Sequence, residues 1–119
     1  MVVEDAEALR LMIREILEAG GYTVLESAEP EEALLTLGMG DTPVHLVLTD
    51  VIMPRMSGPE LAAGVRIARP EIKVLYMSGY TNEAIGQHGV LDAGTQFIQK
   101  PFTADDLLQK VRQALDRND

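Results

Sequence analysis

The chain has 119 residues, no cysteine, 46% hydrophobic residues and a formal net charge of −9. This size suits one domain with one core, which we expect to span residues 1–119. The missing cysteines exclude disulfides, thiolate metal sites and cysteine nucleophiles. The acidic balance argues against direct nucleic-acid binding, which needs basic patches, and no stretch is long and apolar enough for membrane insertion. We therefore expect a cytoplasmic protein.

Strand-like and helix-like patterns alternate along the whole chain. Strands are indicated by short β-branched or apolar runs, and helices by apolar residues at helical spacing. In the helix that precedes Gly20 and Gly21, the predicted apolar face consists of Leu9, Met12, Ile13, Ile16 and Leu17. In chain order we predict a strand at 2–3, a helix at 6–19, a strand at 22–26, a helix at 30–38, a strand at 44–50, a helix at 59–68, a strand at 72–78, a helix at 82–91, a strand at 95–99 and a helix at 103–116 with Thr103 as its N-cap.

Five strands alternating with five helices imply a doubly wound α/β fold with a parallel sheet. In such folds ligands bind beyond the carboxyl ends of the strands, where the strand order reverses. Asp5, Asp50, Ser78 and Lys100 all fall at or just beyond carboxyl ends of predicted strands. We therefore expect these four side chains to meet at one edge of the sheet.

Glu4, Asp5 and Asp50 would crowd together at that edge. Carboxylates so close cannot all stay ionised without a counter-charge, and Mg²⁺ bound by carboxylate oxygens would supply one. Lys100 adds a positive charge suited to phosphate, and Ser78 adds a hydroxyl. This combination suits phosphoryl transfer, in which a carboxylate can be the nucleophile.

Each of these residues has an ordinary structural explanation when it is taken singly. Glu4 and Asp5 could cap a helix, Asp50 could cap a turn, Ser78 could lie in a turn and Lys100 could be a solvated surface lysine. Their joint placement at one sheet edge favours the functional interpretation.

Four motifs carry a resemblance to a known family: "VVED", "LVLTDVIMPRMSG", "VLYMSGY" and "FIQKPF". In order and spacing they resemble the receiver domain of two-component response regulators over nearly the whole chain. The resemblance implies a flavodoxin-like sheet of order 2-1-3-4-5 and a cis Lys100-Pro101 bond. It also implies the roles of the site residues. Asp50 would be the phosphoacceptor, and Lys100 would match the catalytic lysine of the family. Glu4 and Asp5 would form the acidic pair for Mg²⁺, with Asp5 the direct ligand, and Ile52 would offer its backbone carbonyl to the metal. Ser78 and Phe97 would be the switch residues, with Ser78 also counted among the catalytic ones.

By this resemblance the domain accepts a phosphoryl group from a histidine kinase or a histidine phosphotransfer domain. Phosphorylation would then switch the face built from residues 82–116, which is also a candidate surface for a phosphorylation-dependent homodimer. The domain would catalyse only its own phosphorylation and dephosphorylation, so we do not expect an enzyme with a separate substrate.

Two other classes of protein share part of this pattern. A phosphatase of the haloacid dehalogenase type shares the nucleophilic Asp, the hydroxyl, the Lys and Mg²⁺, but it needs an acid two residues after the nucleophile, where this chain has Ile52. A flavodoxin-type flavin module would need a phosphate-cradling loop and aromatic residues to stack the ring.

The first strand is short, since only three residues precede Glu4. The stretches "MSGYTNEAI" and "GTQFIQKPFT" resemble receiver domains that are attached to hybrid sensor histidine kinases. Together with the short first strand, this resemblance favours a domain of a hybrid sensor histidine kinase. A stand-alone single-domain response regulator is the alternative.

Overall fold

The computed structural model describes residues 1–40, 42–53, 55–79 and 96–116. Five strands and four helices lie in these residues. In chain order they are β1 (Val2–Val3), α1 (Glu7–Ala19), β2 (Glu26–Ser27), α2 (Pro30–Gly38), β3 (Leu46–Asp50), α3 (Gly58–Ala68), β4 (Lys73–Ser78), β5 (Phe97–Gln99) and α5 (Ala104–Asp116).

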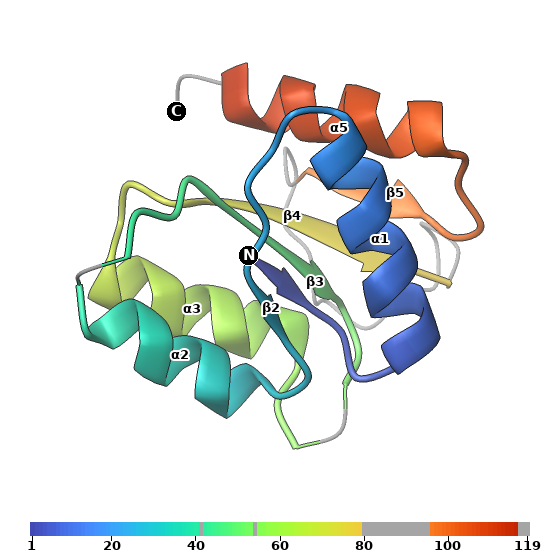
Figure 1. Ribbon diagram of the computed structural model, residues 1–119. Helices are drawn as coiled ribbons and strands as arrows, with labels where there is room; N and C mark the ends of the chain where they lie inside the picture. Colours follow the sequence, from blue (N-terminus) through green and yellow to red (C-terminus); the bar gives the residue numbers. More distant parts are fainter. Residues whose placement is uncertain (41, 54, 80–95, 117–119) are drawn as a thin grey trace.

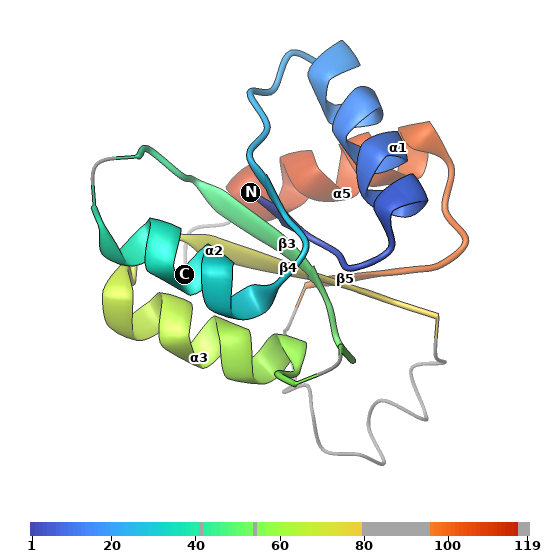
Figure 2. The ribbon, with the colours of Figure 1, turned by 60° about the horizontal axis from the view of Figure 1, so that its bottom comes forward.

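The five strands form one parallel sheet of order β2-β1-β3-β4-β5, as predicted. Helices α1 and α5 cover one face of this sheet, and α2 and α3 cover the other (Figure 1). The second view shows the sheet between these two helical layers (Figure 2). Since β1 lies between β2 and β3, the strand order reverses next to β1, and the loops after β1 and β3 are neighbours at the carboxyl edge.

Each face of the sheet has its own apolar cluster, because successive strand residues point to opposite sides. Val2 and Leu48 pack with Ile13 of α1 and Leu107 of α5 on one side. On the other side Val3 and Val47 pack beneath α2 and α3, with Leu37, Leu61 and Val65 among their buried neighbours. The central strands are therefore covered on both faces, which explains their nearly continuous apolar sequence.

Polar residues set the start of two helices. Ser57 caps α3 by accepting a hydrogen bond from the Glu60 amide at 3.2 Å. Thr103 does the same for α5 through the Asp106 amide at 3.0 Å, and Asp106 in return accepts from the Thr103 amide at 3.1 Å. This reciprocal pair is a capping box, and it confirms Thr103 as the N-cap.

Several predicted boundaries and one predicted face need correction. Only residues 26–27 of the second strand pair, rather than 22–26, because the short β1 offers only Val2 and Val3 as partners. Met12, predicted on the apolar face of the first helix, is 43% exposed, since Ile13 and Leu17 fill the core side of α1. The expected helix at 82–91 lies outside the described residues, as does the start of the strand predicted at 95–99.

One backbone feature bears on the site. The Lys100-Pro101 peptide bond is cis, which confirms the expectation drawn from the resemblance. Among the described helices, none combines the length and the apolar character that a bilayer crossing requires.

Gly58 closes the loop behind Asp50 so tightly that a side chain there should be costly. A Cβ atom would lie 3.0 Å from the Val51 Cα and closer still to the Asp50 carbonyl oxygen. Gly58→Ala should therefore lower the free energy of unfolding by about 2 kcal/mol, as overpacking generally does.

The matched control is Gly38→Ala in α2, where an added Cβ meets nothing within 4 Å. That variant should be neutral or gain up to about 1 kcal/mol from helix propensity. Urea unfolding of both variants checks the comparison, and equal midpoints would contradict the tight packing at Gly58.

Candidate functional site

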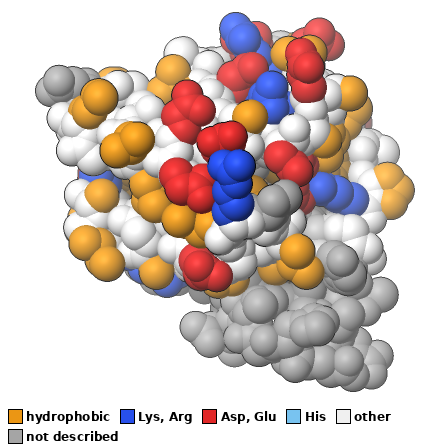
Figure 3. Space-filling view, turned by 90° about the horizontal axis from the view of Figure 1, so that it is seen from below, with side chains coloured by type: hydrophobic (Ala, Val, Ile, Leu, Met, Phe, Trp, Pro, Cys, Tyr) orange, Lys and Arg blue, Asp and Glu red, His pale blue; other side chains and the backbone are white. Residues whose placement is uncertain are grey.

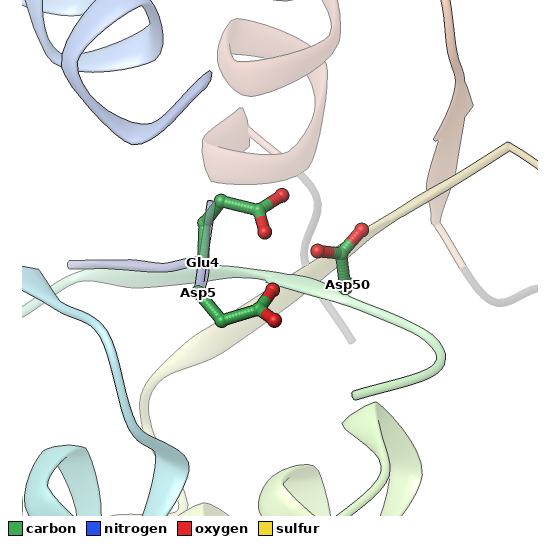
Figure 4. Close-up of side chains that lie close together, drawn as sticks. All are labelled: Glu4, Asp5 and Asp50. Atoms are coloured by element: carbon green, nitrogen blue, oxygen red, sulfur yellow. The ribbon is translucent and has the colours of Figure 1, made fainter. Parts of the chain in front are cut away.

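The carboxyl edge of the sheet gathers acidic residues from two neighbouring strands. Glu4 and Asp5 follow β1, and Asp50 is the last residue of β3. Each offers a carboxylate oxygen, and these atoms all lie within 4.8 Å of one another. Figure 4 shows the three carboxylates pointing into one common space. Figure 3 shows acidic side chains gathered around a few basic ones on the face seen from below.

Lys100, just beyond β5, reaches across this cluster. Its Nζ lies 2.5 Å from Asp50 Oδ1 and 3.2 Å from Glu4 Oε1. Partial burial lowers the pKa of Lys100, but the hydrogen bonds and charges of Asp50 and Glu4 more than offset this, so the net pKa is raised. Lys100 is therefore held as a cation between two acids.

Glu4 is the most deeply placed of the acids, with only 2% of its surface exposed. Its Oε2 accepts a hydrogen bond from the Ala6 amide at 3.1 Å, and its Oε1 faces Lys100. The Glu4 carboxylate therefore contacts both the backbone just before α1 and the lysine at the acidic edge.

Asp5 is exposed, and its pKa is raised above the ordinary value. The first cause is its hydrogen bond with the Glu4 carboxyl group, followed by desolvation and by the charge of Glu4. A raised pKa beside a second carboxyl group is what close negative charges produce.

The charge balance of the cluster fits a divalent cation. Three carboxylates face a single lysine, which leaves two negative charges uncompensated when all three are ionised. Mg²⁺ prefers oxygen ligands at about 2.0–2.1 Å, so that opposite ligands are about 4 Å apart. The carboxylate oxygens of Glu4, Asp5 and Asp50 lie within 4.8 Å of one another, which is close to this separation. The residues present therefore fit the ion.

The remaining predicted residues divide into two groups. Ile52 and Ser78 join the three acids and Lys100 around a depression of about 210 Å³. Ser78 is buried, whereas the Ile52 side chain is 51% exposed. Phe97 lies apart from this depression and packs, partly buried, against Val51, Ala62 and Tyr76.

Sequence reasoning missed one residue that contacts the site. Arg10 in α1 donates from its NH1 group to the backbone carbonyl of Glu4 at 2.8 Å. An arginine on an amphipathic helix is ordinarily part of a solvated face, so the pattern gave no signal for this contact.

Comparisons with known proteins agree with this geometry. Residues 1–112 match the family described as Response regulator receiver domain. The sensor kinase CckA of Brucella abortus is 36% identical over 119 residues, which cover the whole chain but only 13% of that relative. The receiver protein CpdR of the same organism is 28% identical, with 97% of this chain and 94% of CpdR covered.

A solved structure gives the same result for the fold. The crystal structure of the receiver domain from the hybrid histidine kinase CckA superposes with a TM-score of 0.79 and 34% identity, over 97% of this chain and 96% of that one. With its family match, its sheet order and its acidic edge, this chain belongs to the response regulator receiver domain family of two-component signalling.

Proposed function

We propose that Asp50 is the phosphoacceptor of this receiver domain and that Mg²⁺ assists the transfer. The observation that carries the proposal is the cluster itself, in which Lys100 contacts Asp50 while Glu4 and Asp5 lie beside it. Asp50 is 7% exposed, so one face of its carboxylate remains accessible from the depression.

The transfer would begin with attack of an Asp50 carboxylate oxygen on the phosphorus of a phosphohistidine. An oxygen–phosphorus bond forms, the phosphorus–nitrogen bond breaks, and the imidazole leaves with the bonding electron pair and takes up a proton. The product is an acyl phosphate on Asp50. Lys100 lies where it can stabilise the added negative charge, which is the main task of a protein in phosphoryl transfer.

Glu4 and Asp5 are the residues that would hold Mg²⁺, together with Asp50 and the backbone carbonyl of Ile52. When bound, the ion supplies positive charge that neutralises carboxylate and phosphoryl oxygens. Asp5 is the best placed of the three acids to exchange ligands with solvent, because Glu4 is buried and bonded to the Ala6 amide.

The switch would follow from the new charge at Asp50. Ser78 borders the depression and would donate its hydroxyl to a phosphoryl oxygen. Phe97 would then repack behind it, and β5 and α5 would change their preference for partners or form a homodimer; the first part of the predicted 82–116 face lies outside the described residues. This is a local change in charge with a distant consequence.

The larger protein is proposed from the relatives. The match across 13% of a CckA sensor kinase supports a domain of a hybrid sensor histidine kinase, with residues 1–119 as one receiver unit. The near-complete match to CpdR supports a stand-alone regulator as the second candidate. In either case we propose a cytoplasmic domain that exchanges phosphoryl groups with a histidine kinase or phosphotransfer domain, without direct nucleic-acid contact and without a separate substrate.

An apolar depression next to the site supports docking of the phosphodonor there. It has a volume of about 420 Å³ and is lined by Leu9, Met12, Gly79, Lys100, Pro101 and Phe102. Leu9, Gly79 and Lys100 border both depressions, so a partner side chain seated here would lie beside Asp50. The exposed Met12 side chain would then contact the docked partner.

The first prediction from this proposed function concerns the nucleophile. Asp50→Asn should abolish labelling by phosphorylated kinase and by acetyl phosphate, because an amide cannot replace the anionic oxygen. Asp105→Asn, an exposed aspartate in α5, is the matched control and should label normally. Mass spectrometry of the intact protein measures the label, and stoichiometric single-site labelling of Asp50→Asn would contradict the assignment.

The second prediction concerns Asp5 and pH. Because its folded-state pKa is raised, folding favours the protonated form. Without metal, the free energy of unfolding should therefore fall as the pH rises from the ordinary aspartate pKa through the raised one. Asp5→Asn should remove that fall and melt at a higher temperature than the wild type in metal-free buffer at neutral pH.

In excess Mg²⁺ the order should be reversed, because the wild type gains more stability from bound metal than Asp5→Asn does. Differential scanning calorimetry across pH, with and without Mg²⁺, makes both comparisons. A metal-free Asp5→Asn protein that melts well below the wild type would identify Asp5 as a structural residue instead.

The third prediction concerns docking. Met12→Lys should slow transfer from a phosphorylated kinase or phosphotransfer domain by about tenfold, the effect of losing about 1.4 kcal/mol of apolar contact. Labelling by acetyl phosphate should not change. Leu11→Lys is the matched control, because Leu11 is 42% exposed on the same helix but does not border the depression. Equal transfer rates for the two variants would place the docking surface elsewhere.

A further inference from the structure

Arg10 links the acidic edge to the second strand of the sheet. Its NH1 group donates to the carbonyl oxygen of Glu4 at 2.8 Å, and its Nε lies 3.5 Å from Glu26 Oε1. The side chain of Arg10 is only 14% exposed, although it belongs to the amphipathic helix α1. Its guanidinium group is therefore partly buried, and it lies against the backbone just before Asp5.

The carbonyl that Arg10 contacts belongs to the peptide group between Glu4 and Asp5. The direction of this carbonyl, together with the position of the Glu4 Cα atom, fixes the plane of the peptide group, because peptide groups are planar. That plane in turn sets where the Asp5 Cα atom lies and hence where its carboxylate can reach. The other polar groups of Glu4 are already engaged, since its amide donates to Ser27 O and its carboxylate serves Ala6 and Lys100.

We propose that Arg10 is a positioning residue that holds the Glu4–Asp5 peptide group in the orientation that Mg²⁺ binding requires. The proposal rests on the function proposed above, but it assigns a role to a residue outside the acidic cluster. Arg10 does not contact the ion or the phosphoryl group, and it acts only through the backbone that carries Asp5.

Glu26 of β2 holds the other end of the guanidinium group. Its two carboxylate oxygens are divided between Arg10 and Arg14, which lies 3.1 Å from Oε2. An arginine suits this place because its planar fork directs N–H groups to two separate acceptors at fixed angles. A lysine has the charge but not the fork, so it could not hold the carbonyl and Glu26 together.

The competing explanation is an ordinary ion pair between α1 and β2. Ion pairs near the surface contribute little, and the separation between Arg10 and Glu26 is long. That explanation predicts small and similar effects for loss of Arg10 and loss of Arg14. The positioning role predicts that only Arg10 matters for the metal, because Arg14 shares Glu26 but only Arg10 donates to the Glu4 carbonyl.

The test compares wild type, Arg10→Gln, Arg10→Lys and Arg14→Gln. Calorimetric Mg²⁺ titration should show affinity about tenfold weaker in Arg10→Gln, a typical cost of losing a group that orients a metal ligand. Arg10→Lys should not restore the affinity, and Arg14→Gln should match the wild type. Labelling by acetyl phosphate should reach the wild-type level in Arg10→Gln once Mg²⁺ is saturating.

A second readout needs no metal. The carbonyl carbon resonance of Glu4 should shift upfield in metal-free Arg10→Gln, because the carbonyl loses a hydrogen bond, and should stay in place in Arg14→Gln. A thermal melt of each variant establishes that the comparison is made on folded protein.

Equal Mg²⁺ affinities in wild type and Arg10→Gln, with the carbonyl resonance shifted, would overturn the role of Arg10 alone. Full rescue by Arg10→Lys would also overturn it, because the charge and not the fork would then suffice. A wild-type protein that does not bind Mg²⁺ would instead contradict the proposed function itself.

Discussion

The contact of Lys100 with Asp50 and Glu4 is the interaction on which the site depends. Without it, three carboxylates would face one another at the end of a largely buried sheet, and their repulsion would oppose folding. Lys100 relieves part of that repulsion, and two negative charges remain uncompensated when all three carboxylates are ionised. Through Lys100 and Glu4 the residues that follow β5 and β1 are in contact at the carboxyl edge of the sheet, although β3 and β4 lie between these two strands.

The packing of the sheet and helices fixes the backbone that carries Glu4, Asp5 and Asp50. The carboxylates stand on short strands and loops, but apolar clusters on both faces fix the strands, and the capped start of α3 packs against the backbone behind Asp50. Close packing of this kind resists small displacements, which phosphoryl transfer requires of its reacting groups. The apolar clusters on both faces of the sheet therefore keep the acidic edge rigid.

Much of this arrangement could be predicted from residues at strand ends. Asp50 and Lys100 each follow an apolar run, and parallel strands bring such ends to one edge, so their meeting required only the topology. The cis bond at Pro101 could not be reached in this way, because most bonds before proline are trans, and it came from the family resemblance. The prediction for Met12 was wrong and the contact of Arg10 was missed, because helical periodicity does not show which polar neighbour or depression a side chain will meet.

Lys100 and Glu4 are separated by 96 positions in the chain, yet their side chains touch. A nascent chain that has been synthesised only as far as β4 already contains all three acids but not Lys100, which contacts two of them. The acidic edge is consequently among the last features to be completed during synthesis. Until Lys100 has been added, the carboxylates of Glu4 and Asp50 lack the cation that contacts both of them in the folded domain.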